Sequence, residues 1–161
     1  MFKRLFSICA ISALTGCATA PQQPPEAPIS VQLAGSAVEV QDFIQHRSMT
    51  RGSSALQVET ANDRTLIMKG LCTALPDMTP FKCSMIMMAV GNSQWDGPYA
   101  VMTFRTNEVR GNVNLTLQAQ WCATNPFGKT NCMNNGTARD TNELLRKIKS
   151  SYDSEKAEAR K

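Results

Sequence analysis

The segment 112–121 alternates between apolar and polar side chains along its whole length, and this pattern constrains the fold more than any other. Successive side chains of a β-strand point to opposite faces of a sheet. One face of this strand is therefore core and the other faces water. The core face carries Val113, Leu115, Leu117, Ala119 and Trp121, and the wet face carries Asn114, Thr116, Gln118 and Gln120. The apolar face needs a second layer to cover it.

Two segments have the spacing of amphipathic helices that can supply this layer. Ser36 and Glu39 form an S-x-x-E capping box at the start of a helix that we expect to end near Arg47. Thr137 and Asp140 have the same spacing before a C-terminal helix, whose apolar stripe we expect to pack on the core face of 112–121. The predicted stripes are Val40, Phe43 and Ile44 in the first helix, and Leu144, Leu145, Ile148 and Tyr152 in the second.

The remaining apolar segments favour strands. They are 29–33, a hairpin of 56–59 with 64–69, a segment at 83–90, and a hairpin of 99–106 with 112–121. Residues 83–90 are apolar on both faces, which predicts the buried central strand. The sequence therefore predicts an α+β fold: an antiparallel sheet of about five strands with an N-terminal and a C-terminal helix packed on it.

The N-terminus has the order of a bacterial export signal. Lys3 and Arg4 precede an apolar segment, residues 5–14, which is too short to span a bilayer and has the length of a signal-peptide core. It ends in Leu14-Thr15-Gly16-Cys17, which resembles the lipobox of bacterial lipoproteins. The resemblance implies that Cys17 is acylated and becomes the new N-terminus. An ordinary secretory signal with an incidental Cys17 is the alternative.

This resemblance also divides the chain. Residues 1–16 are the expected signal peptide, and 17–28 are the lipidated cysteine and a Pro/Gln-rich tether that reaches about 30 Å when extended. Residues 29–152 form the expected single periplasmic domain, and 153–161 a charged tail that we expect to fray. Ala18 rather than Asp follows the cysteine, which in such lipoproteins favours the outer membrane over the inner one.

Removal of the signal peptide leaves a chain that is nearly neutral. Of the 17 basic side chains 15 remain against 13 acidic ones, so the formal net charge falls from +4 to +2. This balance lacks the positive footprint that nucleic-acid binding needs. We therefore expect no nucleic-acid partner.

Four of the six cysteines belong to the predicted domain: Cys72, Cys83, Cys122 and Cys132. An even number in an oxidising periplasm predicts two disulfides. Of the three possible pairings, Cys72–Cys83 and Cys122–Cys132 close the shortest loops and cost the least entropy. The alternative is a zinc site, but the spacing differs from the close cysteine pairs of structural zinc sites.

The sequence contains no complete motif for catalysis or nucleotide binding. Gly128-Lys129-Thr130 matches the end of a P-loop, but Ala123 stands where the first glycine is required. A loop, Asn131–Asn135, follows where that motif needs a helix. His46 is the only histidine, and Asp42 four residues earlier fits a surface pair. We expect no nucleotide and no enzymatic activity.

Two groups of residues have side chains of the kind that bind a ligand. Met85, Met87 and Met88 are soft ligands that suit Cu(I), although methionine more often fills a core. We therefore expect no metal and no cofactor.

The polar face of 112–121 suits a saccharide or a protein partner, and the alternative is a solvated sheet face. It consists of Asn114, Thr116, Gln118 and Gln120, and we expect Trp95, Tyr99 and the Asn-rich loop to contribute to the same site.

These observations predict an outer-membrane lipoprotein that faces the periplasm. Its membrane contact is the lipid on Cys17, and we expect it to be a non-enzymatic accessory or binding component of a cell-envelope assembly, such as a secretion or conjugation machine. One alternative is a periplasmic inhibitor of a lytic enzyme such as lysozyme, with a stapled loop as a plug. The other is a saccharide- or peptidoglycan-binding module.

Overall fold

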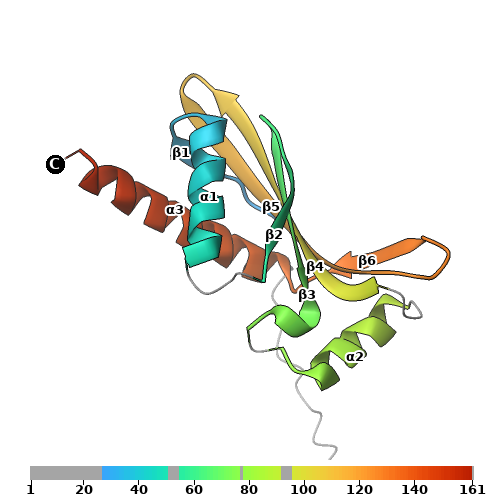
Figure 1. Ribbon diagram of the computed structural model, residues 1–161. Helices are drawn as coiled ribbons and strands as arrows, with labels where there is room; N and C mark the ends of the chain where they lie inside the picture. Colours follow the sequence, from blue (N-terminus) through green and yellow to red (C-terminus); the bar gives the residue numbers. More distant parts are fainter. Residues whose placement is uncertain (1–26, 51–54, 77, 92–95, 161) are drawn as a thin grey trace, which may run out of the picture.

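The computed structural model describes residues 27–50, 55–76, 78–91 and 96–160, and Figure 1 shows their arrangement. The predicted α+β fold is confirmed. In chain order the elements are β1 (Val31–Ala34), α1 (Ala37–Thr50), β2 (Gln57–Ala61), β3 (Thr65–Leu71), the 3-10 turn η1 (Cys72–Ala74), α2 (Pro80–Val90), β4 (Asp96–Val109), β5 (Asn112–Thr124), β6 (Thr130–Asn134) and α3 (Ala138–Glu158).

The strands form one antiparallel sheet in the order β1-β5-β4-β3-β2, and β6 pairs with β5 outside this path. The two predicted hairpins are present as β2–β3 and β4–β5. β1 and β6 share one edge of β5: Val31 pairs with Leu115 near one end, and Asn134 pairs with Gln120 near the other.

The main core lies between the sheet and helices α1 and α3, which cover the same face (Figure 1). Leu117 of β5 pairs with Phe104 of β4, and Phe104 pairs with Leu66 of β3, so that their side chains form one row beneath these helices. Leu145 and Tyr152 of α3 are buried in the same cluster, as the stripe predicts. The Phe43 ring of α1 meets the Tyr152 ring edge-on, with the centroids 5.1 Å apart.

A second, smaller core lies farther along β4 and β5, beneath α2. Trp121 pairs with Ala100, and by strand alternation both point to the face that carries Leu117. They pack with Cys83, Met87 and other buried residues of this half. The three α-helices of the described residues, α1, α2 and α3, therefore cover one face of the bent sheet, and the opposite face carries the alternate residues.

The segment predicted as the central strand, 83–90, is the helix α2 instead. Thr79 caps the helix by accepting a hydrogen bond from the Lys82 N–H, Pro80 occupies its first turn, and Gly91 ends it with a φ of 71°. Burial has helical spacing, with Cys83, Met87 and Val90 inside. Residues 83–90 are apolar on both faces when they are placed on a strand, which predicted burial on both sides. In the helix only one side is buried, and Met85 and Met88 are exposed on the other.

Two boundaries also differ from the prediction. Asn131–Asn134, expected in a loop, belong to β6, so the sheet has six strands. The C-terminal helix does not stop near Tyr152 but runs to Glu158, well into the expected frayed tail. An ion pair between Lys156 and Glu39 joins this last part of α3 to α1.

Among the described residues, no helix is both long enough and apolar enough to span a membrane.

Candidate functional site

The four residues of the predicted binding face lie together on the sheet face opposite the helices, which we call the open face. Thr116 and Gln118 are exposed, and Asn114 and Gln120 are half-buried. The sheet register adds neighbours from β4, because Thr116 pairs with Arg105 and Gln118 with Thr103. The remaining pairs on this face are Asn114 with Asn107, Gln120 with Val101, Arg105 with Thr65, Thr103 with Ile67, and Val101 with Lys69.

The charged side chains of these rows, Arg105 and Lys69, are both basic. The Lys69 ammonium lies 3.8 Å from the centroid of the Tyr99 ring, a cation–π contact. The Tyr99 hydroxyl is 3.0 Å from the Thr124 hydroxyl, and the ring is buried. Tyr99 is therefore not available to stack on a sugar, and Trp95, the other predicted aromatic, lies outside the described residues. The open face offers hydrogen bonds and positive charge.

A hollow of about 440 Å³ adjoins this face at the end of the sheet near η1. Lys69 and Gln57, which are paired across β3 and β2, contribute to its wall together with Glu59. Basic, acidic and amide groups therefore meet in one concavity, which suits a polar ligand or a partner side chain.

The start of the domain is held by Asn142, a residue that the sequence analysis did not identify. Its side-chain amide donates to the Ala27 carbonyl over 2.8 Å, and its Oδ1 accepts the Ile29 N–H over 3.0 Å. Asn142 is 0% exposed. Its position three residues before Leu145, on the buried side of α3, is the sequence signal that was available.

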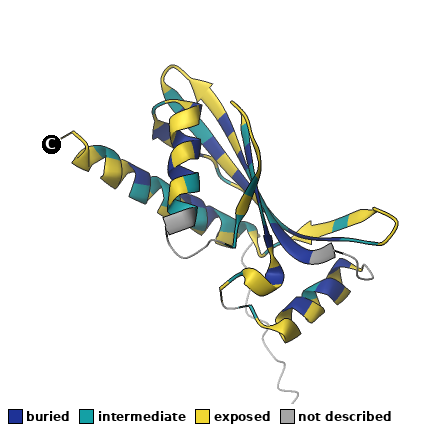
Figure 2. Cartoon of the chain, in the orientation of Figure 1, coloured by how far each residue is buried: buried dark blue, intermediate teal, exposed yellow. Residues whose placement is uncertain are grey.

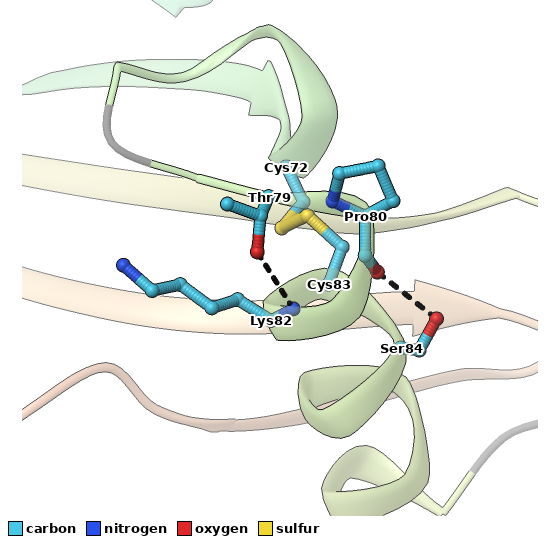
Figure 3. The surroundings of a disulfide bond; sticks show 6 residues. All are labelled: Cys72, Thr79, Pro80, Lys82, Cys83 and Ser84. Carbon is cyan, nitrogen blue, oxygen red and sulfur yellow. Dashed lines mark hydrogen bonds between the residues drawn. A yellow bond between two sulfur atoms is a disulfide. The ribbon is translucent and has the colours of Figure 1, made fainter.

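Both disulfides have the predicted pairing. Cys72 of η1 is bonded to Cys83 in the first turn of α2, beside the Thr79 cap and the Ser84 hydroxyl, which donates to the Pro80 carbonyl (Figure 3). Cys122 and Cys132 are directly opposite each other on β5 and β6. The two bonds therefore fix α2 and the β5–β6 hairpin, which together form the end of the molecule that we call the stapled half.

The stapled half exposes several large apolar side chains. On α2, Phe81 is 74%, Met85 50% and Met88 66% exposed, while exposed and buried residues alternate around the helix (Figure 2). Phe127, in the turn between β5 and β6, is 94% exposed. The predicted methionine cluster is thus divided: Met87 is core, and Met85 and Met88 share the outer side of α2.

A groove between α1 and α3 brings several ionisable groups close together. Asp42, His46 and Glu155 line it with Lys156, whose hydrogen bond lowers the pKa of the Glu39 carboxyl below its ordinary value. Burial raises the pKa of the neighbouring Tyr152 hydroxyl. Across the described parts of the chain, no three His, Cys, Asp or Glu side chains are grouped so that they could hold a metal ion.

Two other features from the sequence are the P-loop-like motif and Cys17. Gly128-Lys129-Thr130 lies at the β5–β6 turn and the start of β6, where Asn125 accepts the backbone N–H groups of Phe127 and Lys129. No helix begins there, so these backbone groups do not form a phosphate cradle. Cys17 lies outside the described residues.

Comparisons with protein-family models, curated proteins and solved structures found no match to this chain.

Proposed function

We propose that the chain is a lipoprotein of the outer membrane that faces the periplasm and acts as a non-enzymatic binding component of a cell-envelope assembly, with the open face as its binding surface. The observation that carries the proposal is the continuous open face. It joins the uncharged hydrogen-bonding groups of β5 to Arg105 and Lys69, while α1, α2 and α3 pack on the other side of the sheet.

Several features of the open face support binding of a protein. Amide and hydroxyl groups at Asn114, Thr116 and Gln118 can pair with polar groups of a partner, and Arg is enriched at protein interfaces. Because strands β3, β4 and β5 hold the backbone beneath these groups in register, binding would require no ordering of that backbone. The same face keeps the saccharide-binding alternative open, although the burial of Tyr99 removes one expected stacking surface.

The proposed anchor has its own test. If Cys17 is acylated, Cys17→Ser should abolish metabolic labelling with a fatty acid and leave the chain unprocessed or soluble. Unchanged labelling and unchanged sedimentation with the outer membrane would contradict the lipoprotein assignment.

The open face is tested by combining Thr116→Arg with Gln118→Glu. This double variant keeps the net charge and changes only side chains that point away from the core, so its melting temperature should stay within a few degrees of the unmodified protein. We expect it to lose the proteins that the unmodified chain captures in crosslinked envelopes. A variant with Val38→Arg and Ser150→Glu, at exposed positions of α1 and α3, is the matched control and should capture them normally. Full capture by the double variant would remove the open face from consideration.

The inhibitor alternative is favoured by one specific feature, the β5–β6 hairpin. Its turn presents Phe127 with 94% exposure, and the Cys122–Cys132 bond fixes the strands behind it. A stapled hairpin with an exposed apolar tip suits insertion into an enzyme cleft. Inhibition of lysozyme by the purified domain, lost in Phe127→Ser, would favour this function over the open face.

A further inference from the structure

We propose that the outer side of α2 rests on the lipid surface to which the chain is anchored, as a second membrane contact separate from the lipid on Cys17. This inference depends on the anchor of the proposed function, but not on the open face. It starts from Phe81, Met85 and Met88, which are 74%, 50% and 66% exposed.

These three side chains form a helical stripe. Their spacing of four and three residues places them on one side of α2, and Cys83, Met87 and Val90 occupy the buried side with the same spacing. The packed side and the disulfide to Cys72 prevent α2 from turning its apolar stripe toward the protein core. Because burying such side chains is favourable, an apolar stripe that is fixed in water is a surface on which an external partner can bind.

The length of the chain before the domain favours lipid as that partner. Nine residues, 18–26, lie between the proposed lipidated Cys17 and Ala27, so ten Cα–Cα steps join the two, and an extended chain advances at most about 3.6 Å per step. Cys17 is therefore within about 35 Å of Ala27, which Asn142 holds against α3. A tether of this length keeps a domain at an effective concentration near the millimolar range, so a weak apolar contact is sufficient.

The point where the tether enters also lies close to the stapled half. Pro28 lines a hollow with Gln118 and Ala119 of β5 and with Asn134 at the end of β6. β6 in turn contacts α2. The anchor thus pulls on the domain near the base of the hairpin that packs beside α2, rather than at the distant end of the sheet where β4 and β5 are joined (Figure 1).

Charge and orientation agree with a lipid surface. The sequence of α2 contains Lys82 and no Asp or Glu, so an anionic leaflet would attract it and not repel it. The stripe points away from the sheet, and the open face lies on the other side of the sheet. Contact through α2 would therefore leave Thr116 and its neighbours directed toward the periplasm, where a protein partner can reach them.

Oxidation of methionine by hydrogen peroxide can test this contact without an added label. The lipidated full-length protein is reconstituted in vesicles of phosphatidylethanolamine and phosphatidylglycerol and treated briefly with hydrogen peroxide, which converts exposed Met to the sulfoxide. Peptide mass spectrometry then gives the oxidation rate of each residue. We expect Met85 and Met88 to react several-fold more slowly than in Cys17→Ser protein in buffer, whereas Met87, buried in both states, should react slowly throughout.

Two variants complete the experiment. Thr116→Met adds an exposed methionine on the open face, and it should oxidise at the same rate with and without vesicles. Phe81→Ser with Met88→Ser removes two thirds of the stripe, and Met85 should then lose its protection in vesicles. The matched control, Val38→Ser with Val109→Ser, removes exposed apolar side chains elsewhere and should leave the protection unchanged.

Each other outcome has a defined meaning. If the protein sediments with the vesicles while Met85 and Met88 oxidise at the rate seen in buffer, the lipid contact is wrong and the anchor is right. If the protein does not sediment with them, the anchor itself fails. If the two methionines are protected in vesicle-free Cys17→Ser protein in a concentration-dependent way, a second copy of the chain covers the stripe, and the lipid proposal is overturned.

Discussion

Asn142 lies on the buried side of α3, where a polar amide is costly unless its hydrogen bonds are satisfied. It is satisfied by backbone groups more than 110 residues away: the Ile29 N–H and the Ala27 carbonyl. Without the Asn142 side chain, the Ile29 N–H and the Ala27 carbonyl would lose this hydrogen-bond partner at the point where the chain enters the domain. Asn142 therefore defines where the tether ends and the rigid domain begins.

Asn142→Ala should lower the free energy of unfolding by about 1–3 kcal/mol, because it leaves the two backbone groups without their partner in a partly buried place. Urea denaturation measures this change, and limited proteolysis should show faster cleavage near Ala27. Asn134→Ala, which truncates an exposed amide on β6, is the control and should change stability by less than about 0.5 kcal/mol. Equal stability of the two variants would mean that Asn142 does not hold the N-terminal segment.

The individual elements show what could be predicted from local sequence. β5 was predicted because its alternation continues over many residues, and α3 because a capping box precedes a helical stripe. α2 was misread because its residues are apolar all round, so that neither period stands out. The signals that would have identified it are at its ends: Thr79-Pro80 is a helix start, and Gly91 is a helix stop.

The capping box of α3 should make the stability of this helix depend on pH. The Thr137 N–H donates to the Asp140 carboxylate over 2.7 Å and lowers the pKa of Asp140 below its ordinary value of 3.8. Because the folded pKa is below the unfolded one, the ionised carboxylate stabilises the fold above pH 3.8, and this contribution is lost as the pH falls through the folded pKa.

Asp140→Asn should therefore be less stable than the unmodified protein near neutral pH, and the difference should shrink as the pH falls below 3.8. Urea titrations between neutral and acidic pH measure the difference. Thr137→Ala removes the hydroxyl of the cap and should cost about 1 kcal/mol near neutral pH. A difference between Asp140→Asn and the unmodified protein that is the same at every pH would show that ionisation of Asp140 does not contribute.

For the whole molecule, the open face was predictable and its surroundings were not. The alternation in β5 alone identifies which side chains point away from the core, since the period of a strand is two. Three features depend on residues far apart in sequence. They are the pairing of both β1 and β6 with one edge of β5, the position of α2 on the same face as α3, and the Asn142 contact. No local pattern contains such information, whereas the disulfide pairing was accessible because short loops close at the least entropic cost.

Two cores on one pair of strands suggest that the molecule opens in two steps. The main core buries large side chains such as Leu33, Leu66, Met68, Leu115 and Leu145 under α1 and α3. The second core contains Ala100 and Ala123 among its buried residues, and its helix α2 has an exposed outer side. Fewer buried apolar contacts mean a lower free energy of local opening, so α2 should open without unfolding of the sheet.

Hydrogen exchange followed by mass spectrometry can test this prediction at the level of peptides. In the disulfide-bonded protein, amides of α2 should exchange faster than those of β5 around Leu115, with a free energy of opening below that of global unfolding. Replacing Cys72 and Cys83 by Ala removes a loop closure with a sequence separation of 11, which should lower the free energy of opening of α2 by up to about 3 kcal/mol. Amides of β5 near Leu115 should keep most of their protection, because their neighbours belong to the main core. If α2 and β5 instead lose protection together in the double variant, the two cores form one cooperative unit, and the boundary between them has no energetic meaning.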